Sequence, residues 1–372
     1  MSCDSCSRRD FLQWASIAGL GLLAPLPLHA AMPGGLRSGG DPEIGSSDRT
    51  LILVTLLGGW DGWAACIPRA IGSDRQGQGL GWTSASVPLS DHTHLHADLA
   101  ALAPIWEAGR LQVLLGTGGT SGSAAPTHTQ QLAQWLAGGE SDAGWLTGMP
   151  ALRRGVPYQA CLGAASIPVP DAMVLPSFAL HAPDDVQRRR AGPTTAAARF
   201  AEHLQHTVRT VSDAPTGSRD GSMAWSTQIQ RALRLIAEPV RPAVVTLSHT
   251  GFDTHVDQAA RLPALFQSLA TGLAELRRGL IAQGTWDSTL VAVGGDVGRS
   301  FELNALGGTD HASASVAMLM GGAVTGGLVN EQNWHPAGSC LTTTPWIPDV
   351  AQRWWNEPVS KRSLIGQLLR AS

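Results

Sequence analysis

The chain has 372 residues, of which 43% are hydrophobic and 15% are charged, and its formal net charge is -3. This apolar content is enough for a large core, which excludes a chain that is disordered throughout. The slightly acidic balance offers no basic surface to a phosphate backbone, so we expect no nucleic-acid partner. The 43 glycines follow no three-residue period, which excludes collagen.

The first thirty residues have the pattern of an export signal. Ser7–Leu12 (SRRDFL) is a twin-arginine motif, and an uncharged run rich in Ala, Gly and Leu follows over Trp14–Ala31. A membrane anchor is the competing interpretation, but glycines and prolines interrupt the run, whereas a span needs roughly 20 apolar residues. We therefore predict a signal peptide over 1–30, handled by the twin-arginine translocation machinery, and a periplasmic or secreted product with no stable membrane span after cleavage.

Strand and helix patterns alternate in the rest of the chain. Four apolar runs ending near glycines or polar residues predict buried strands: Leu51–Leu57, Leu111–Leu115, Val244–Leu247 and Leu290–Val293. Helical patterns cover Leu99–Ala108, after the first run, and Gln258–Ile281, after the third. This order predicts a single α/β domain over 31–372, with a mostly parallel central sheet and helices on both faces.

The segment 155–221 departs from this alternation and is rich in Pro, Ala, Arg and Thr. We expect an inserted irregular segment or a cap there. Its run Arg188–Arg190 has two interpretations, contact with an anionic ligand or an ordinary solvated surface, and the second is the commoner. Near the end of the chain, an amphipathic stretch around Trp354–Trp355 and Leu364–Leu369 predicts a packing helix.

Polar residues follow the predicted strands, at the edge where open α/β sheets bind ligands. Six of them are carboxylates or imidazoles: Asp61, Asp253, His255, Asp296, Asp310 and His311. Asp253 and His255 are two residues apart, which in an extended chain puts both side chains on one face. Carboxylate and imidazole groups bind hard and borderline divalent cations, so the sequence predicts a shared metal site.

Other interpretations of the polar residues stay open. Asp61 lies in a glycine-rich turn, where a capping role is as reasonable as a metal ligand. The Asp and His residues together would also suit a hydrogen-bonded network that supports the loops without metal. The tract His92–His96 has three alternating histidines that suit a metal, although it precedes a helix start.

Thr127 and His128 follow the second strand and precede a helical pattern. Free backbone N–H groups at a helix N-terminus hold oxyanions or phosphates, which favours a catalytic position. Threonine is also an ordinary N-cap residue, and this structural role is the commoner one.

Several motifs together resemble the exported bacterial family catalogued only as domain of unknown function 1501. They are the twin-arginine head, the strand leading into Gly58–Gly62, the stretch Leu102–Leu111, Gly144–Leu146, Gly251–His255 and Gly308–His311. The family is in turn similar to the alkaline phosphatase and sulfatase superfamily. That resemblance implies an alkaline-phosphatase-like fold and one or two divalent ions (Zn²⁺, Mg²⁺, Ca²⁺ or Mn²⁺).

The resemblance also implies roles for single residues. Asp61 corresponds to the metal ligand after the first strand, Thr127 to the nucleophile, and Asp253, His255, Asp296 and His311 to ligands of two ions. We expect Arg299 to clamp a phosphate or sulfate oxygen through its planar guanidinium. The chain departs from the superfamily at Val297, where a histidine commonly follows the aspartate, so one ligand is missing.

The expected function is therefore an exported, metal-dependent hydrolase that acts on phosphate or sulfate esters of a small molecule or a polymer. An alternative is a non-catalytic exported protein that keeps the fold and assists a protein partner, which the missing ligand at Val297 favours. A third is a glycan-binding module that uses exposed residues among its 13 tryptophans.

Overall fold

The structure is a computed structural model, which describes residues between 49 and 355 with several gaps. The described residues are 49–71, 75, 79–81, 83–118, 159–162, 177–179, 223–238, 241–312, 314–336, 350–351 and 354–355. The chain divides into two units, Met1–Gly39 and Gly40–Ser372, and all described residues belong to the second. Within these ranges no helix is both long and apolar enough to cross a membrane.

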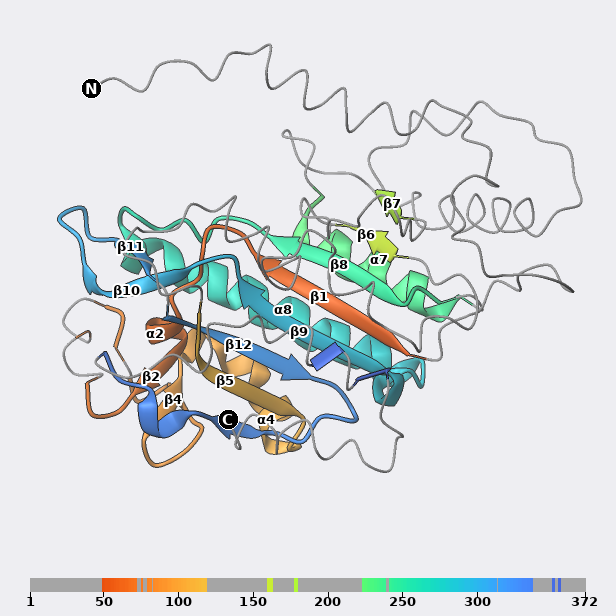
Figure 1. The fold of residues 1–372 in the computed structure, drawn as a ribbon, viewed down its shortest axis with the longest axis horizontal. Helices are drawn as coiled ribbons and strands as arrows, with labels where there is room; N and C mark the ends of the chain where they lie inside the picture. The colour runs from red at the N-terminus through yellow and green to blue at the C-terminus, as the bar shows by residue number, and fades with distance from the viewer. Residues whose placement is uncertain are drawn as a thin grey trace, which may run out of the picture. The chain divides into compact units, whose positions relative to one another are not determined.

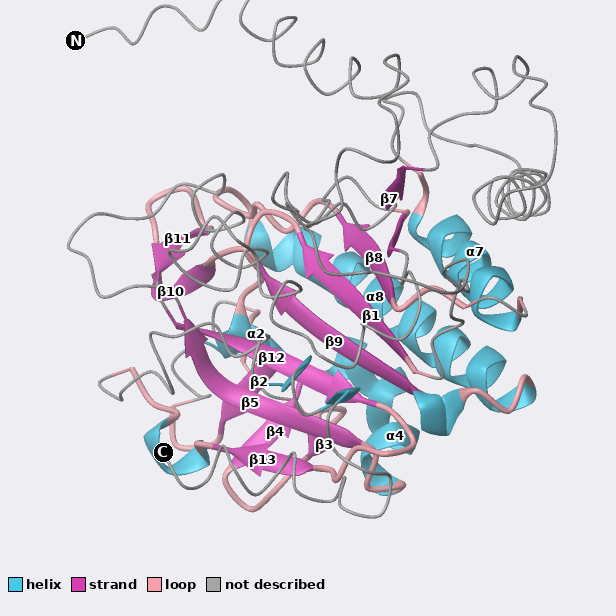
Figure 2. Ribbon diagram, turned by 45° about the vertical axis from the view of Figure 1, so that its right-hand side comes forward, coloured by secondary structure: helices cyan, strands magenta, loops and turns pink. Residues whose placement is uncertain are grey.

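An eight-stranded sheet forms the centre of this unit, in the order β13-β5-β12-β9-β1-β8-β6-β7 (Figures 1 and 2). Its strands are β1 (Thr50–Leu56), β5 (Leu111–Gly118), β6 (Gln159–Cys161), β7 (Ser177–Ala179), β8 (Val244–His249), β9 (Thr289–Gly295), β12 (Ala314–Met320) and β13 (Gly327–Val329). The four predicted strands are confirmed as β1, β5, β8 and β9. β12 was not predicted, and it pairs antiparallel with both β5 and β9.

The other strand pairs of this sheet are parallel, as predicted. In the central register, Leu51 of β1 lies opposite Val244 of β8 on one side and Leu290 of β9 on the other. The carboxyl ends of β9, β1 and β8 are therefore neighbours at one edge, and the loops that leave these strands begin side by side.

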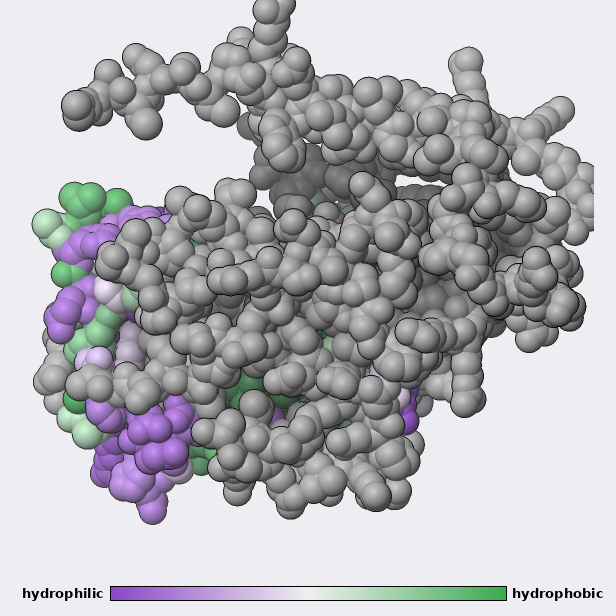
Figure 3. Space-filling model, in the orientation of Figure 1, coloured by the Kyte–Doolittle hydropathy of each residue, from purple (hydrophilic) through white to green (hydrophobic). Residues whose placement is uncertain are grey.

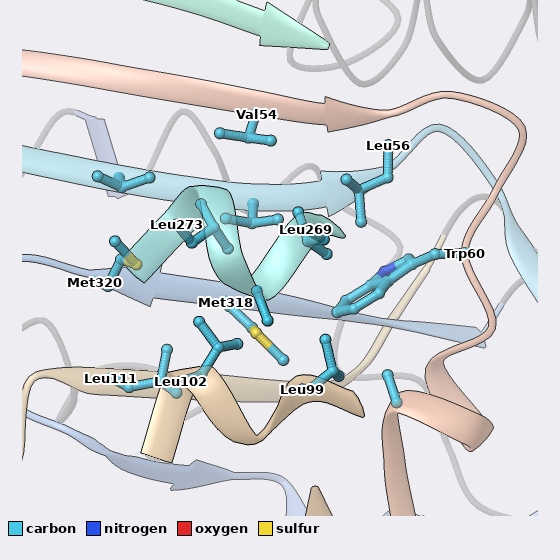
Figure 4. Packing of buried hydrophobic residues seen from close by; sticks show 14 of the residues in the cluster. Val54, Leu56, Trp60, Leu99, Leu102, Leu111, Leu269, Leu273, Met318 and Met320 are labelled. Carbon is cyan, nitrogen blue, oxygen red and sulfur yellow. The ribbon is translucent and has the colours of Figure 1, made fainter. Parts of the chain in front are cut away.

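One face of the sheet is covered by three helical segments. α7 (Trp225–Ala237), α8 (Gln258–Ala282) and the turn η1 (Ala97–Leu102) bury apolar side chains against it. Figure 4 shows Leu269 and Leu273 of α8 facing Val54 of β1 and Met318 of β12. The predicted helix Leu99–Ala108 is present as η1 followed by α4 (Ala103–Glu107).

The opposite face carries the alternate side chains of the same strands. Leu51 and Leu53 point to this side and pack in a second core with Val350, Ala351 and Trp354. The four described residues near the end of the chain, 350–351 and 354–355, are helical. The predicted packing role is confirmed at Trp354 and Trp355, whereas Leu364–Leu369 lies outside the described residues. The second face of the sheet thus also has helical cover.

Smaller elements lie outside the main sheet. They are α2 (Gly62–Ala65), the sheet of β2 (Cys66–Pro68), β3 (Val87–Pro88) and β4 (Thr93–Leu95), the hairpin of β10 (Gly298–Leu303) and β11 (Thr309–Ala312), and the turns η5 (Trp286–Ser288) and η6 (Glu331–Asn333). The segment 155–221, which we predicted as an insertion or cap, contributes β6 and β7 to the main sheet. Its other residues lie outside the described ranges, apart from Leu162.

We predict that Leu273→Ala lowers the free energy of unfolding by about 2–5 kcal/mol, because Leu273 is buried between α8 and the sheet and the variant leaves a cavity. Urea denaturation followed by circular dichroism measures this. The control Leu306→Ala removes a side chain that is 62% exposed, so its effect should stay within about 0.5 kcal/mol. Equal losses for both variants would contradict the packing described.

Candidate metal centre

Three loops converge beyond the carboxyl ends of β1, β8 and β9. The loop after β1 approaches the loop after β8 so closely that a Cβ on Gly58 would lie 2.3 Å from the backbone nitrogen of Asp253. Gly58 has a φ of +106°, a conformation that residues with side chains rarely adopt. Glycine is therefore required there by both space and backbone conformation. Asp253 also lies beside the β10–β11 hairpin, where Arg299 donates to its carboxylate.

Asp253, His255 and His311 bring three potential ligand atoms together. His255 Nε2 lies 3.1 Å from His311 Nε2 and 3.2 Å from Asp253 Oδ1. His311 Nε2 lies 3.8 Å from the same Oδ1. Ligand atoms that surround a tetrahedral cation at about 2.0–2.1 Å are about 3.3 Å from one another. The three atoms thus have the spacing of ligands around a single cation.

The group is open to solvent on one side. The side chain of Asp253 is 53% exposed, whereas that of His311 is 15% exposed. In the space-filling view of Figure 3, hydrophilic and hydrophobic residues are mixed at the end of the molecule where Figure 1 places β10 and β11. A cation held here would therefore have a coordination position that a water molecule or a ligand can reach.

Asp310 and Asn304 orient His255 from its other side. Asp310 Oδ1 lies 3.2 Å from His255 Nδ1, which leaves Nε2 directed toward the ligand group. Asn304 Nδ2 donates to Asp310 Oδ1 at 3.0 Å and to the carbonyl oxygen of His255 at 3.0 Å. The hydrogen bond from Asn304 and then that from His255 lower the pKa of Asp310. Asp310 is therefore an ionised partner of a ligand, an arrangement common around metal-bound histidines.

Arg299 is fully buried beneath this group. Nε donates to the carbonyl oxygen of Gly59 at 2.8 Å, and Nη1 donates to that of Thr309 at 2.8 Å. Nη2 donates to the carbonyl oxygens of Gly58 and Phe252 and, at 2.5 Å, to Asp253 Oδ1. A substrate clamp needs an exposed fork, so this geometry gives Arg299 a positioning role in place of the predicted contact with a phosphate oxygen.

Asp61 lies outside the ligand group. It is fully buried and caps α2, where its Oδ1 accepts from the backbone nitrogen of Ala64 at 3.0 Å. Arg75 donates to Oδ1 at 3.2 Å and to Oδ2 at 2.8 Å, and Gln258 donates to Oδ2 at 2.6 Å. The capping interpretation of Asp61 is confirmed. Its carboxylate faces a guanidinium, which corrects the prediction that it faces a metal ion.

Asp296 holds the loop after β1 through hydrogen bonds to backbone nitrogens. Its Oδ1 accepts from the backbone nitrogens of Gly58 at 3.1 Å and of Val297 at 3.0 Å, and the residue is buried. Thr127 and His128 lie outside the described residues. Among the residues that are described, one group of Asp and His ligands forms, so the second ion of a two-metal site has no ligand set there.

The tract His92–His96 forms no ligand group within the described part of the chain. His96 caps η1, where its Nδ1 accepts from the backbone nitrogen of Asp98 at 3.2 Å. Burial lowers the pKa of His96 and keeps the imidazole neutral. This histidine has a structural role at the start of the helical turn.

The described tryptophans belong mainly to the core. Trp60, Trp63, Trp286, Trp334, Trp354 and Trp355 are buried. Trp63 stacks on Trp334 with ring centroids 3.8 Å apart. No tryptophan among the described residues is an exposed side chain, so this part of the chain offers no support for glycan binding through exposed indole rings.

Sequence reasoning did not identify three residues that shape the site: Arg75, Gln258 and Asn304. Arg75 and Gln258 are separated from Asp61 by 14 and 197 positions, and no motif connects them. Asn304 carries a local signal, since it begins the glycine-containing turn between β10 and β11, where Asn is favoured.

A comparison with protein families matches part of the chain. The family described as "Protein of unknown function (DUF1501)" matches residues 183–334. This range contains the whole ligand group and Arg299. No curated protein sequence matches the chain significantly.

Solved structures resemble the chain with low TM-scores and low sequence identity. Ps i-CgsB in complex with k-i-k-neocarrahexaose has a TM-score of 0.37 and 9% identity, over 73% of this chain and 65% of that one. A protein in the alkaline phosphatase superfamily from Vibrio parahaemolyticus has a TM-score of 0.35 and 12% sequence identity, over 76% of this chain and 62% of that one. The soluble domain of lipooligosaccharide phosphoethanolamine transferase A from Neisseria meningitidis has a TM-score of 0.39 and 11% sequence identity, over 89% of this chain and 90% of that one. The chain thus spans less than two thirds of the length of the first two.

We predict that Arg299→Met lowers the free energy of unfolding of the metal-free protein by about 3–5 kcal/mol, because it removes the buried cation beside Asp253 and leaves carbonyl oxygens without donors. Urea denaturation measures the loss. Arg261→Met is the matched control, because that exposed guanidinium donates to the same loop at Asp253 and Gly251. Its cost should be below about 1 kcal/mol, and a similar cost for Arg299→Met would contradict the positioning role.

Proposed function

We propose that the chain is a metal-dependent hydrolase of phosphate or sulfate esters that uses one divalent cation at Asp253, His255 and His311. The observation that carries this proposal is the convergence of three ligand atoms from two separate segments within 3.1–3.8 Å. Three protein ligands with one accessible position are typical of catalytic metal sites, whereas structural sites use four protein ligands.

The types of ligand atom in the group favour some divalent metal ions over others. Two imidazoles and one carboxylate suit Zn²⁺ or Mn²⁺ better than Mg²⁺ or Ca²⁺, which prefer oxygen ligands alone. When bound, such an ion supplies Lewis-acid polarisation and lowers the pKa of a coordinated water. The residues of the chain hold the ligands in place: Asp310 orients His255, and Arg299 holds Asp253.

Charge favours an anionic substrate. The carboxylates of Asp253 and Asp310 bring two negative charges, and Arg299 brings one positive charge. With neutral histidines the group has a net charge of about -1, and a divalent ion would raise it to about +1. A site with this charge at an exposed surface attracts a phosphate or sulfate ester, either small or polymeric. Thr127 remains the proposed nucleophile by the family resemblance.

A second candidate function is a non-catalytic protein that binds one metal ion and assists a protein partner. The ion pair between Arg75 and Asp61 favours it, because it commits a carboxylate that two-metal catalysis would use. Val297 favours it as well, since it provides no ligand after Asp296. Ester hydrolysis by the metal-loaded protein separates this candidate from the first.

We expect the purified mature protein to contain about one Zn²⁺ or Mn²⁺ per chain, measured by elemental analysis. His255→Ala should weaken metal binding by at least about 100-fold, since loss of a partner behind a ligand already costs about 10–100-fold. It should also abolish hydrolysis of nitrophenyl phosphate and nitrophenyl sulfate. The control His92→Ala removes an exposed histidine outside the group and should change neither result.

Each result of this experiment has a separate meaning. A wild-type protein that binds no divalent ion overturns the metal site and both functions built on it. A protein that binds one ion, loses it in His255→Ala and hydrolyses no ester in either assay supports the non-catalytic candidate. Hydrolysis that persists in His255→Ala would contradict the assignment of the active site to this group.

We also propose that the protein is exported by the twin-arginine pathway, which the SRRDFL sequence at Ser7–Leu12 supports. The double variant Arg8→Lys, Arg9→Lys should leave the uncleaved chain in the cytoplasm, as judged by cell fractionation and immunoblotting. The control Arg37→Lys changes an arginine outside the motif and should still be exported. Equal export of all three proteins would contradict this route.

A further inference from the structure

A buried glutamine connects the two segments that carry the ligands. Gln258, the first residue of α8, is fully buried. Its Oε1 accepts from the hydroxyl of Thr254 at 2.8 Å and from that of Thr309 at 2.5 Å. Thr254 lies between Asp253 and His255 in the chain, and Thr309 lies two residues before His311. One oxygen atom therefore receives hydrogen bonds from both ligand-bearing segments.

The two segments also touch through their backbones. The backbone nitrogen of Thr309 donates to the carbonyl oxygen of Thr254 at 3.2 Å. A Cβ on Gly308 would lie 2.0 Å from the carbonyl carbon of His255. This contact leaves the two segments little room to shift relative to one another.

The other end of Gln258 is held by an ion pair. Its Nε2 donates to Asp61 Oδ2 at 2.6 Å, and Arg75 contacts both oxygens of that carboxylate. Both members of the pair are buried. A buried carboxylate needs a positive partner, and Arg75 supplies it without metal. The cation is fixed to the chain at the position where the family resemblance implies a metal ion.

We propose that Gln258 is a positioning residue for the metal centre, and that Arg75, Asp61 and Gln258 form a metal-independent brace. In this brace, the Arg75 guanidinium holds Asp61. Asp61 holds the amide of Gln258, and Gln258 holds the hydroxyls of Thr254 and Thr309. This inference rests on the proposed metal site. It adds that the ligand geometry exists before the ion binds, which lowers the cost of binding.

The test compares metal affinity with stability in two buried-glutamine variants. Gln258→Met keeps the length of the side chain and removes its amide, so Thr254 and Thr309 lose their common acceptor. The affinity of the folded protein for Zn²⁺ and Mn²⁺, measured by competition with a chromogenic chelator, should fall about 10–100-fold. Thermal unfolding of the metal-free protein is recorded in parallel.

Gln228→Met is the matched control. Gln228 is also buried and bonds through its amide, to Ser248 and Met223, which are not ligands. This variant should lower the melting temperature and leave metal affinity within about twofold of wild type. If Gln258→Met does not fold, Thr309→Val serves instead, because it removes only one hydroxyl donor to Gln258 and should still weaken metal affinity.

The outcomes are distinct. Wild-type affinity in Gln258→Met or Thr309→Val overturns the brace and leaves the metal site and the proposed function standing. A wild-type protein without measurable affinity overturns the metal site and the brace together. One ion bound per wild-type chain, with affinity that depends on Gln258 and not on Gln228, supports the brace.

Discussion

The buried guanidinium of Arg299 is the interaction on which the rest of the site depends. Five oxygen atoms accept its hydrogen bonds: the carbonyls of Gly58, Gly59, Phe252 and Thr309, and the carboxylate of Asp253. These residues come from the loop after β1, the loop after β8 and the β10–β11 hairpin. Backbone carbonyls that are buried in irregular loops need donors, and one planar cation supplies them to all three segments. The loops are thereby held where Asp253 meets two histidines.

Two arginines pair with two carboxylates of this region in different environments. Arg75 is paired with Asp61 in the interior, and Arg299 is paired with Asp253 at the surface of the group. The first carboxylate is fully buried, whereas the second is about half exposed. A carboxylate enclosed by a guanidinium, an amide and a helix cap has little capacity left for an ion. This difference in environment explains why, among the described residues, Asp253 joins a group of possible metal ligands and Asp61 does not.

Much of the sheet was predictable because its strands are buried on both faces. β1, β8 and β9 are continuous apolar runs, and their parallel order follows from the helices between them. β12 escaped prediction because Ala314–Met320 (ASVAMLM) is rich in Ala, Met and Leu, which favour helices as isolated residues. It becomes a strand because β5 and β9 leave a position between them. Similarly, the three-residue strands β6 and β7 are too short for a periodic signal and depend on pairing beside β8.

The sequence by itself determined which residues follow the strands, and so it predicted that Asp253, His255 and His311 would lie at one edge of the sheet. Only the tertiary structure decided which polar residues join the ligand group and which are committed to partners. Asp61 and Asp253 look alike in their motifs, yet one meets Arg75 and Gln258 inside the protein and the other meets two imidazoles. Their roles depend on burial and on partners distant along the chain, and neither is encoded by local spacing.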